Sequence, residues 1–295
     1  MNTNNNLYTI IYTTVIVVVV AALLAFVSQS LKSKQDANEK AETISQMLTA
    51  AQYGSKAELD KLPNSAKLEK YEAELQEAFV VSLSGEKGKV LEGIEVYGPK
   101  ALKRQNYNIK GGPNKTGEPE LPVFIFRNGS TVVPIYGAGL WGPVWGYIAF
   151  EADGVTIKGA YFDHESETAG LGAKIKDDPD FQAEFVGEKI DWNNVDLSAP
   201  IDWDKVNVFE IVKGGAPKQA DGSSLVDGKI DAITGATMTS QGLDAAIDTW
   251  LAAYAAYFGG NAPVISSEVS PVISSEVSPV ISSEVEKSNV EEVSL

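Results

Sequence analysis

An uncharged apolar run near the N-terminus restricts this chain more than any other feature of its sequence. Residues 7–27 contain no Asp, Glu, Lys or Arg over 21 positions. As a helix that rises about 1.5 Å per residue, the run is about 30 Å long, which matches the hydrocarbon core of a bilayer. A cleaved signal peptide is the alternative, but its apolar part is usually about 7–15 residues long and follows a charged start. The start here is uncharged, so we expect one retained transmembrane helix.

The composition excludes several classes of site. Cysteine is absent and His164 is the only histidine. The chain therefore cannot hold a disulfide, a thiolate-bound iron–sulfur cluster, a c-type haem or a multi-histidine metal site on its own. The formal net charge is −16, and such acidity disfavours nucleic acid and anionic lipid as partners. Any chemistry must use carboxylates, hydroxyls, lysines or a bound organic cofactor.

Helical patterns occur on both sides of a strand-rich stretch. Residues 30–51 read as a polar helix that continues out of the membrane, and residues 66–80 read as a second helix. A final helix is predicted to start near Thr239 or Ser240 and to end at the glycines 259 and 260. One face of it is expected to pack on a core, through Leu243, Ile247, Trp250, Leu251, Tyr254 and Phe258.

Two hairpins are predicted between these helices. Asn128-Gly129 and Asp153-Gly154 each divide a pair of apolar runs, at residues 123–134 and 147–163, and favour two-residue type I′ turns. Residues 205–212 read as another strand. The whole pattern predicts an α+β fold: one N-terminal transmembrane helix, then a domain with an antiparallel sheet and flanking helices.

The chain divides into four expected parts. These are a short N-terminus with the transmembrane helix (1–31), a juxtamembrane helical segment (32–81), the main domain (82–260) and a tail (261–295). The tail repeats the octapeptide PVISSEVS from Pro263 and Pro271, then PVISSEVE from Pro279. Regular proline with exposed Ser and Glu favours disorder, and we assign the tail no function.

A glycine-rich loop at residues 137–142 matches the dinucleotide fingerprint G-x-G-x-x-G. The match fails on context, because that fingerprint must open a helix and here Pro143 and a predicted strand follow. We therefore reject NAD binding. The loop reads better as a segment that carries Leu140 and Trp141 and lets a flat ligand approach the backbone.

A second polar loop follows the second hairpin. His164 and Glu167 have the spacing of two metal ligands, but two ligands do not make a site, and an ordinary polar loop is the other alternative. The more specific interpretation uses Gly170 and Gly172, whose backbone N–H groups no side chain shields. With Glu167 and Thr168 as acceptor and donor, this loop suits the edge of a polar heterocycle.

The third candidate segment, at residues 231–240, directly precedes the final helix. It begins at Asp231 and contains Thr234, Gly235, Ala236 and Thr237. Small residues and clustered hydroxyls at a helix start form a ready phosphate site, because the first N–H groups of a helix are unpaired. The alternative is that a hydroxyl two or three residues later is simply an N-cap.

This segment carries a family resemblance. Asp-x-x-Thr-Gly-Ala-Thr resembles the flavinylation motif of FMN-binding domains in ion-pumping respiratory complexes, above all the C-subunit family of sodium-translocating NADH:quinone reductases. The glycine-rich loop, the Glu-Thr-x-Gly-Leu-Gly loop and Lys213-Gly214 add to it; Ala169 stands where that family usually has Pro. The resemblance implies FMN bound covalently to Thr237 by a phosphoester, installed by a flavin transferase.

The resemblance also implies roles for the other candidate residues. Trp141 and Leu171 would pack on the flavin ring, Glu167, Thr168 and the glycine backbone would hydrogen-bond it, and Lys213 would favour its reduced, anionic form. The implied protein is the electron-carrying subunit of a bacterial inner-membrane complex. Its other subunits would handle NADH, quinone and sodium.

Two questions stay open at this stage. The family places the domain on the periplasmic side, whereas Lys32 and Lys34 after the apolar run weakly favour the cytoplasm; we follow the family. The alternatives to this function are the G subunit of an Rnf-type ferredoxin:NAD complex and a membrane-anchored scaffold or adhesin without redox function.

Overall fold

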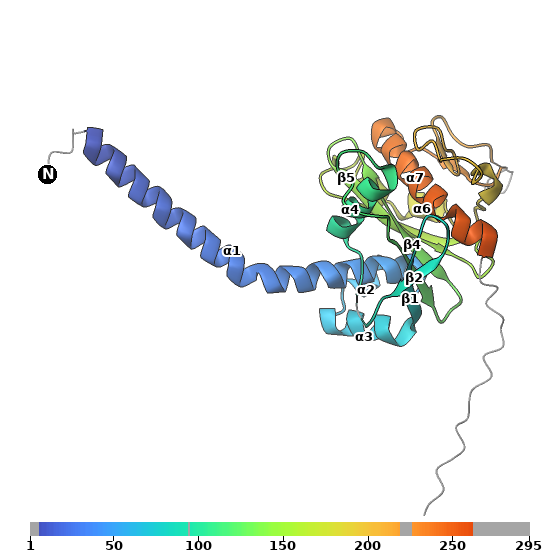
Figure 1. The fold of residues 1–295 in the computed structure, drawn as a ribbon, viewed down its shortest axis with the longest axis horizontal. Coiled ribbons are helices and arrows are strands. Elements are labelled where there is room, and N and C mark those ends of the chain that lie inside the picture. The colour runs from blue at the N-terminus through green and yellow to red at the C-terminus, as the bar shows by residue number, and fades with distance from the viewer. Residues whose placement is uncertain (1–5, 94, 219–225, 262–295) are drawn as a thin grey trace, which may run out of the picture. The chain divides into compact units, whose positions relative to one another are not determined.

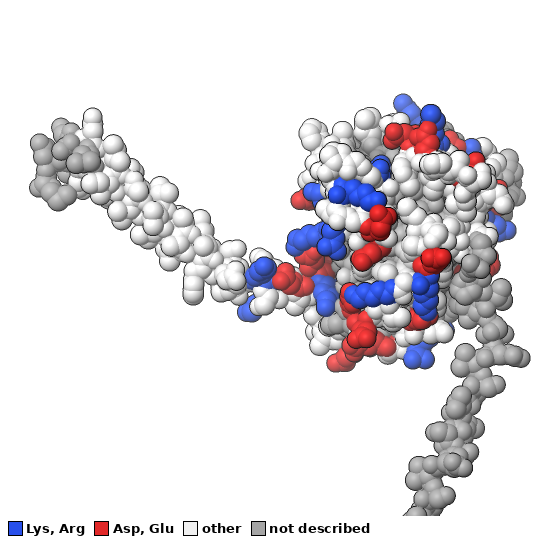
Figure 2. Space-filling view, viewed as in Figure 1, with Lys and Arg blue, Asp and Glu red and all other residues white. Residues whose placement is uncertain are grey.

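A single long helix connects the apolar run to the domain. The computed structural model describes residues 6–93, 95–218 and 226–261, and helix α1 spans Asn6–Ala50 (Figure 1). The first part of α1 is exposed and free of charged side chains, as Figure 2 shows, and it is long and apolar enough to cross a membrane. The second part of α1 confirms the helix predicted at residues 30–51. Its apolar residues Ala41, Ile44 and Leu48 are fully buried against the domain.

The domain is built on a six-stranded antiparallel sheet, which confirms the expected α+β fold. The strand order is β2-β1-β3-β4-β5-β6. Short loops join most strands that follow one another in the sequence, as is common in antiparallel sheets. The strands are β1 (Leu75–Val81), β2 (Lys87–Val90), β3 (Leu121–Phe126), β4 (Thr131–Ala138), β5 (Pro143–Phe150) and β6 (Ile157–His164).

Helices cover both faces of this sheet. On one face, α7 (Thr237–Asn261) packs so closely on β4 that a Cβ on Gly137 would lie 2.5 Å from Ala246 Cβ. On the other face, a Cβ on Gly159 would lie 2.5 Å from the carbonyl oxygen of Ala50 in α1. The predicted apolar face of α7 is confirmed as core. The remaining helical elements are α2 (Lys56–Leu59), α3 (Asn64–Glu74), α4 (Pro99–Lys110), α5 (Lys174–Asp177), α6 (Pro179–Ala183) and a 3₁₀ turn, Trp192–Asn194.

The predicted helix at residues 66–80 is wrong in its second half. Helix α3 ends at Glu74, and the chain continues directly as β1. Strand β1 lies between β2 and β3, and its last four residues, 78–81, are all buried. Pairing on both edges and burial on both faces override the helical spacing, because Phe79, Val80 and Val81 fit a pleated sheet well.

Both predicted hairpins are confirmed, but their turns are not type I′. That type needs positive φ at two residues, and here only the glycines have it, at +82° for Gly129 and +66° for Gly154. The Asn128 side chain instead accepts a hydrogen bond from the Ser130 amide at 3.1 Å, and Asp153 accepts one from the Val155 amide at 2.9 Å. These local bonds hold longer loops in which one glycine supplies the left-handed residue.

The strand predicted at residues 205–212 is confirmed only at its end. Strand β7 spans Glu210–Val212 and pairs in parallel with β8, Lys229–Asp231, in a separate two-stranded sheet. The amides of Val208 and Phe209 donate to the Asp248 side chain on α7 instead of to a strand. The predicted disordered tail falls on residues 262–295, outside the described part of the chain.

Candidate functional site

Three loops meet at the end of the sheet where β4 and β6 finish and β5 begins. Strand pairing places Ala138 opposite Pro143 and Val144 opposite His164, so the loop at residues 139–142 and the loop that follows β6 emerge side by side. The start of α7 lies against the first of them, because a Cβ on Gly242 would be 3.1 Å from Gly139 Cα. The three candidate segments, far apart in the sequence, therefore form one site. As the sequence indicated, a strand and not a helix follows residues 137–142.

The first turn of α7 offers unpaired backbone donors. The helix begins at Thr237, and its first backbone bond is donated by Ser240 to the carbonyl of Ala236 at 2.9 Å. The amides of Thr237, Met238 and Thr239 have no hydrogen-bond acceptor among the residues that the structure describes. Unpaired N–H groups at the positive end of a helix dipole attract an anion.

The alternative of an N-cap at Thr239 or Ser240 is wrong. Both residues lie inside α7, and their hydroxyls have other partners: Thr239 donates to Glu167 Oε2 at 2.7 Å, and Ser240 accepts from the Ile233 amide at 3.2 Å. The final helix thus starts two residues earlier than the sequence indicated. The hydroxyl of Thr237 stands in its first turn, half-buried, beside the three free amides.

Large apolar side chains surround this helix start without being buried. The exposed fractions are 48% for Leu140, 67% for Trp141, 43% for Leu171 and 58% for Met238. Leu171 lies against the segment at residues 231–240, because a Cβ on Gly235 would be 3.1 Å from Leu171 Cδ2. Exposed apolar side chains gathered around a few polar groups are typical of a ligand site. A flat, largely apolar ring with a phosphate would fit both parts.

Glu167 is buried among the three loops. It is 8% exposed, and its Oε1 accepts a hydrogen bond from the Trp141 amide at 2.9 Å while its Oε2 accepts from the Thr239 hydroxyl. Thr168 and Gly170 are exposed, whereas Gly172 is buried beneath the Glu167 carboxylate.

His164, which has metal-ligand spacing to Glu167 in the sequence, also has a partner within the loop. His164 Nδ1 accepts from the Glu167 amide at 3.1 Å. Within the described ranges, no group of three His, Asp or Glu side chains is arranged to hold a metal ion.

Asp231 and Lys213 lie at the same end of the small parallel sheet. Val212 pairs with Asp231, so the exposed Lys213 emerges beside the residues that lead to Thr237. Asp231 Oδ1 accepts from the Ala216 amide at 2.5 Å, and Oδ2 pairs with Lys218 Nζ at 2.8 Å. Partial burial acts to raise the pKa of Asp231, but Lys218 and the amide lower it more, and the net pKa lies below the ordinary value. Asp231 thus fixes the loop after β7.

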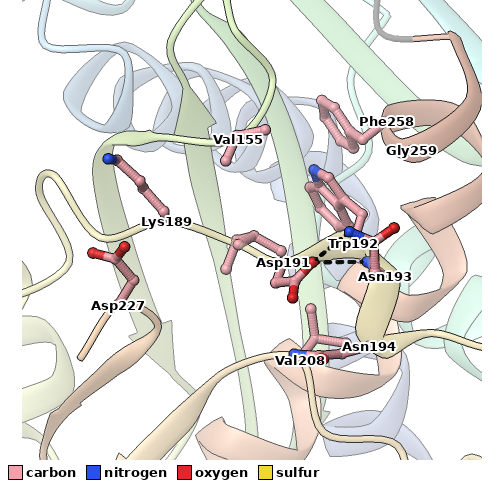
Figure 3. A pocket seen from close by; sticks show the side chains of 11 residues that line it. Val155, Lys189, Asp191, Trp192, Asn193, Asn194, Val208, Asp227, Phe258 and Gly259 are labelled. Carbon is pink, nitrogen blue, oxygen red and sulfur yellow. Dashed lines mark hydrogen bonds between the residues drawn. The ribbon is translucent and has the colours of Figure 1, made fainter.

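A cavity of about 500 Å³ lies at the opposite end of α7 and takes no residue from the three loops. Figure 3 shows Trp192 and Phe258 on one side of it and Lys189 and Asp227 on another. Asp191 holds this wall by accepting from the backbone and side-chain nitrogens of Asn193, at 3.0 and 2.8 Å.

Sequence reasoning missed two residues of the site, Met238 and Thr239 as a partner of Glu167. Their position just after the attachment motif was the available signal. The missing information was the true start of α7, which also decides which amides are free.

Comparison with known proteins agrees with this geometry. Residues 139–252 match the family model described as FMN-binding domain, a range that holds all three loops and most of α7. The C subunit of the Na(+)-translocating NADH-quinone reductase of Vibrio vulnificus is 32% identical over 133 residues, 44% of this chain and 46% of that protein. The corresponding protein of Chlamydia trachomatis is 37% identical over 138 residues, 45% of this chain and 43% of that protein. The matched segments thus span less than half of these relatives.

A solved structure extends the likeness to most of the domain. The crystal structure of the C subunit from Parabacteroides distasonis superposes with a TM-score of 0.55 at 28% identity, over 77% of this chain and 96% of that one. Residues 139–252 therefore resemble an FMN-binding domain, and the chain resembles, in sequence and in fold, the C subunit of Na(+)-translocating NADH-quinone reductases.

Proposed function

We propose that this chain is the FMN-carrying subunit of a membrane Na⁺-translocating NADH:quinone reductase, and that its FMN is attached to Thr237 by a phosphoester bond. The observation that carries the proposal is the start of α7. There, the half-buried Thr237 lies in a first turn whose three backbone amides have no acceptor in the described chain, and Leu140, Trp141, Leu171 and Met238 are exposed in that turn and in the loops packed against it.

The phosphate end of the cofactor suits this helix start. A phosphodiester keeps one negative charge, and the unpaired amides of residues 237–239 with the helix dipole would stabilise it. Gly235 has φ of +83° and carries no side chain. It therefore leaves space between Leu171 and the backbone that leads into α7. Thr234 and Ala236 complete the turn, while Asp231 holds the loop that precedes it.

The ring end suits the apolar surface. Trp141 and Leu171, with Leu140 and Met238, would pack on the isoalloxazine, and exposed Thr168 and Gly170 would meet its polar edge. Lys213 would favour its reduced, anionic form. FMN would supply the electron chemistry, and the protein would hold it and set its potential.

The rest of the proposal extends the family resemblance of the sequence. NADH, quinone and the sodium path would belong to other subunits of the complex, and a flavin transferase would attach the FMN. Helix α1 would anchor the protein in a bacterial inner membrane with the domain on the periplasmic side. A covalent bond is useful there, because a dissociated cofactor would be lost.

Covalent attachment can be tested directly. After co-expression with a flavin transferase, we expect the chain to fluoresce under ultraviolet light in a denaturing gel, and Thr237→Ala to lose that signal. Thr116→Ala is the matched control, since Thr116 is an exposed threonine outside the three loops and its variant should stay fluorescent. A dark wild-type band, or equal fluorescence in Thr237→Ala, contradicts the proposal. Sodium-dependent NADH:quinone activity of the co-purified complex then tests its wider part.

A further inference from the structure

We propose that Glu167 is a positioning residue that holds the three loops of this site together, and that it does not bind the flavin itself. The inference rests on the proposed function and adds to it what keeps the attachment threonine and the ring-packing tryptophan in register. Each of the two carboxylate oxygens of Glu167 accepts a hydrogen bond from a different segment of the site.

The two hydrogen bonds come from segments far apart in the sequence, and the Ser166 hydroxyl adds another bond between two of these loops by donating to the Trp141 carbonyl at 2.9 Å. One bond to Glu167 runs from the Trp141 amide, in the loop between β4 and β5, and the other from the Thr239 hydroxyl, in the first turn of α7. Glu167 itself belongs to the loop after β6, where its amide donates to His164 Nδ1 at 3.1 Å. One side chain therefore fixes three loops, and hydrogen bonds to a charged acceptor are stronger than neutral ones.

Neighbouring glycines make room for this carboxylate. A Cβ on Gly139 would lie 2.5 Å from Glu167 Oε1, and a Cβ on Gly172 would lie 2.6 Å from Oε2 and equally close to Thr239 Oγ1. Both distances are too short for any other residue. From the sequence, we expected Gly139 and Gly172 to let a ligand approach the backbone. The structure shows that both make room for the Glu167 bridge.

Burial separates this role from direct flavin binding. Glu167 is 8% exposed, whereas the ring-packing candidate Trp141 is 67% exposed. Both carboxylate oxygens already accept a bond, and a carboxylate near the phosphate of FMN would repel it. The arrangement is a bridge between loops under the site.

Amide hydrogen exchange of the FMN-free full chain tests the bridge without relying on the flavin. Because the Trp141 amide is protected by Glu167, we expect its exchange in Glu167→Ala to be about tenfold faster or more. Glu165→Ala is the matched control, since Glu165 is exposed two residues earlier and should leave this amide unchanged. Unchanged exchange in Glu167→Ala overturns the proposal.

Rescue by a neutral analogue separates positioning from charge. Gln at this position accepts from the Trp141 amide with its oxygen and donates to Thr239 with its nitrogen. We therefore expect Glu167→Gln to keep most of the covalent flavin and Glu167→Ala to lose at least about fivefold. Equal losses in both variants mean that the charge itself acts on the flavin, and the bridge is then the wrong explanation.

A second pair of variants covers the case in which Glu167→Ala fails to fold. Thr239→Val removes only the hydroxyl and should lower flavin attachment, while Thr239→Ser keeps it and should match the wild type. Equal attachment in these two variants overturns the proposal. A wild-type chain that takes up no flavin contradicts the proposed function, yet the exchange experiment still decides the bridge.

Discussion

Single residues decide whether residues 231–237, the proposed attachment motif, can adopt their conformation. Gly235 has φ of +83°, a left-handed value that costs an L-residue about 1 kcal/mol, and a Cβ there would lie 3.1 Å from Leu171 Cδ2. We expect Gly235→Ala to lower the free energy of unfolding by about 1 kcal/mol and also to reduce flavin attachment, because it displaces Leu171. Thermal unfolding and in-gel fluorescence measure the two effects.

The matched control for this prediction is Gly187→Ala. Gly187 has a similar φ of +88°, but a Cβ there meets nothing within 4 Å. It should therefore show the backbone cost alone and keep its flavin. If both variants attach flavin equally well, the contact with Leu171 has no role in the site.

At the scale of elements, α7 carries two carboxylates that hold β7 and the residues just before it. Asp244 Oδ1 accepts from the Ile211 amide at 2.7 Å, and Asp248 Oδ1 accepts from the Val208 and Phe209 amides at 2.7 and 3.0 Å. Burial raises the pKa of Asp244 from 3.8 to about 7 and that of Asp248 to about 6, although the amides act in the opposite direction.

These raised pKa values predict a pH dependence of stability. The folded state binds protons that the unfolded chain has already released, so the stabilisation is complete below about pH 4 and is lost as the pH rises toward 7. We expect the melting temperature to fall across that window. In Asp244→Asn with Asp248→Asn the fall should be smaller, because Asn still accepts from the amides and does not ionise.

Asp196→Asn serves as the control for this pair. Its hydrogen bonds with Ser198 hold the pKa of Asp196 below the ordinary value, so its titration lies outside the window. Its profile from pH 4 to 7 should match the wild type. A double variant whose melting temperature falls as steeply as the wild type's would contradict the assignment of the pH dependence to α7.

For the whole molecule, the central question is how the long apolar helix α1 is joined to the candidate site. Gln46, in the buried part of α1, donates to Asp163 Oδ2 at 2.8 Å and accepts from Trp145 Nε1 at 3.3 Å. Asp163 also pairs with Lys176 at 2.9 Å, and the loop of Glu167 begins two residues later, after the end of β6. The end of α1 is thus bonded to both strands that lead into the site.

This junction predicts a difference between its buried and exposed contacts. Gln46→Ala removes the hydrogen-bond partner of the buried Asp163 Oδ2 and of the half-buried Trp145 Nε1, and should lower the free energy of unfolding by about 2 kcal/mol, measured by denaturant unfolding. Lys100→Ala breaks the Lys100–Glu39 pair, which also ties α1 to the domain but is solvent-exposed. It should leave stability unchanged. Equal effects would show that the buried junction does not hold α1.

Sequence alone determined the features whose cause is local. The uncharged run predicts the exposed part of α1, Asn128-Gly129 marks a hairpin because its residues favour a turn, and the spacing of Leu243 and Ile247 orients α7. Local patterns of this kind need no partner from elsewhere in the chain to be read. The resemblance of residues 231–237 to a flavinylation motif likewise predicts a single attachment residue, Thr237.

The tertiary structure decided everything that depends on residues far apart in the chain. Strand β1 exists because β2 and β3 pair with it, although its sequence continues a helical pattern. Glu167 was a candidate flavin ligand from its loop alone, and only the fold placed the Trp141 amide and the Thr239 hydroxyl on its two oxygens. Hydrogen-bond partners and strand pairing are set by which segments pack together, and that choice depends on the free energy of the whole chain, which no local window contains.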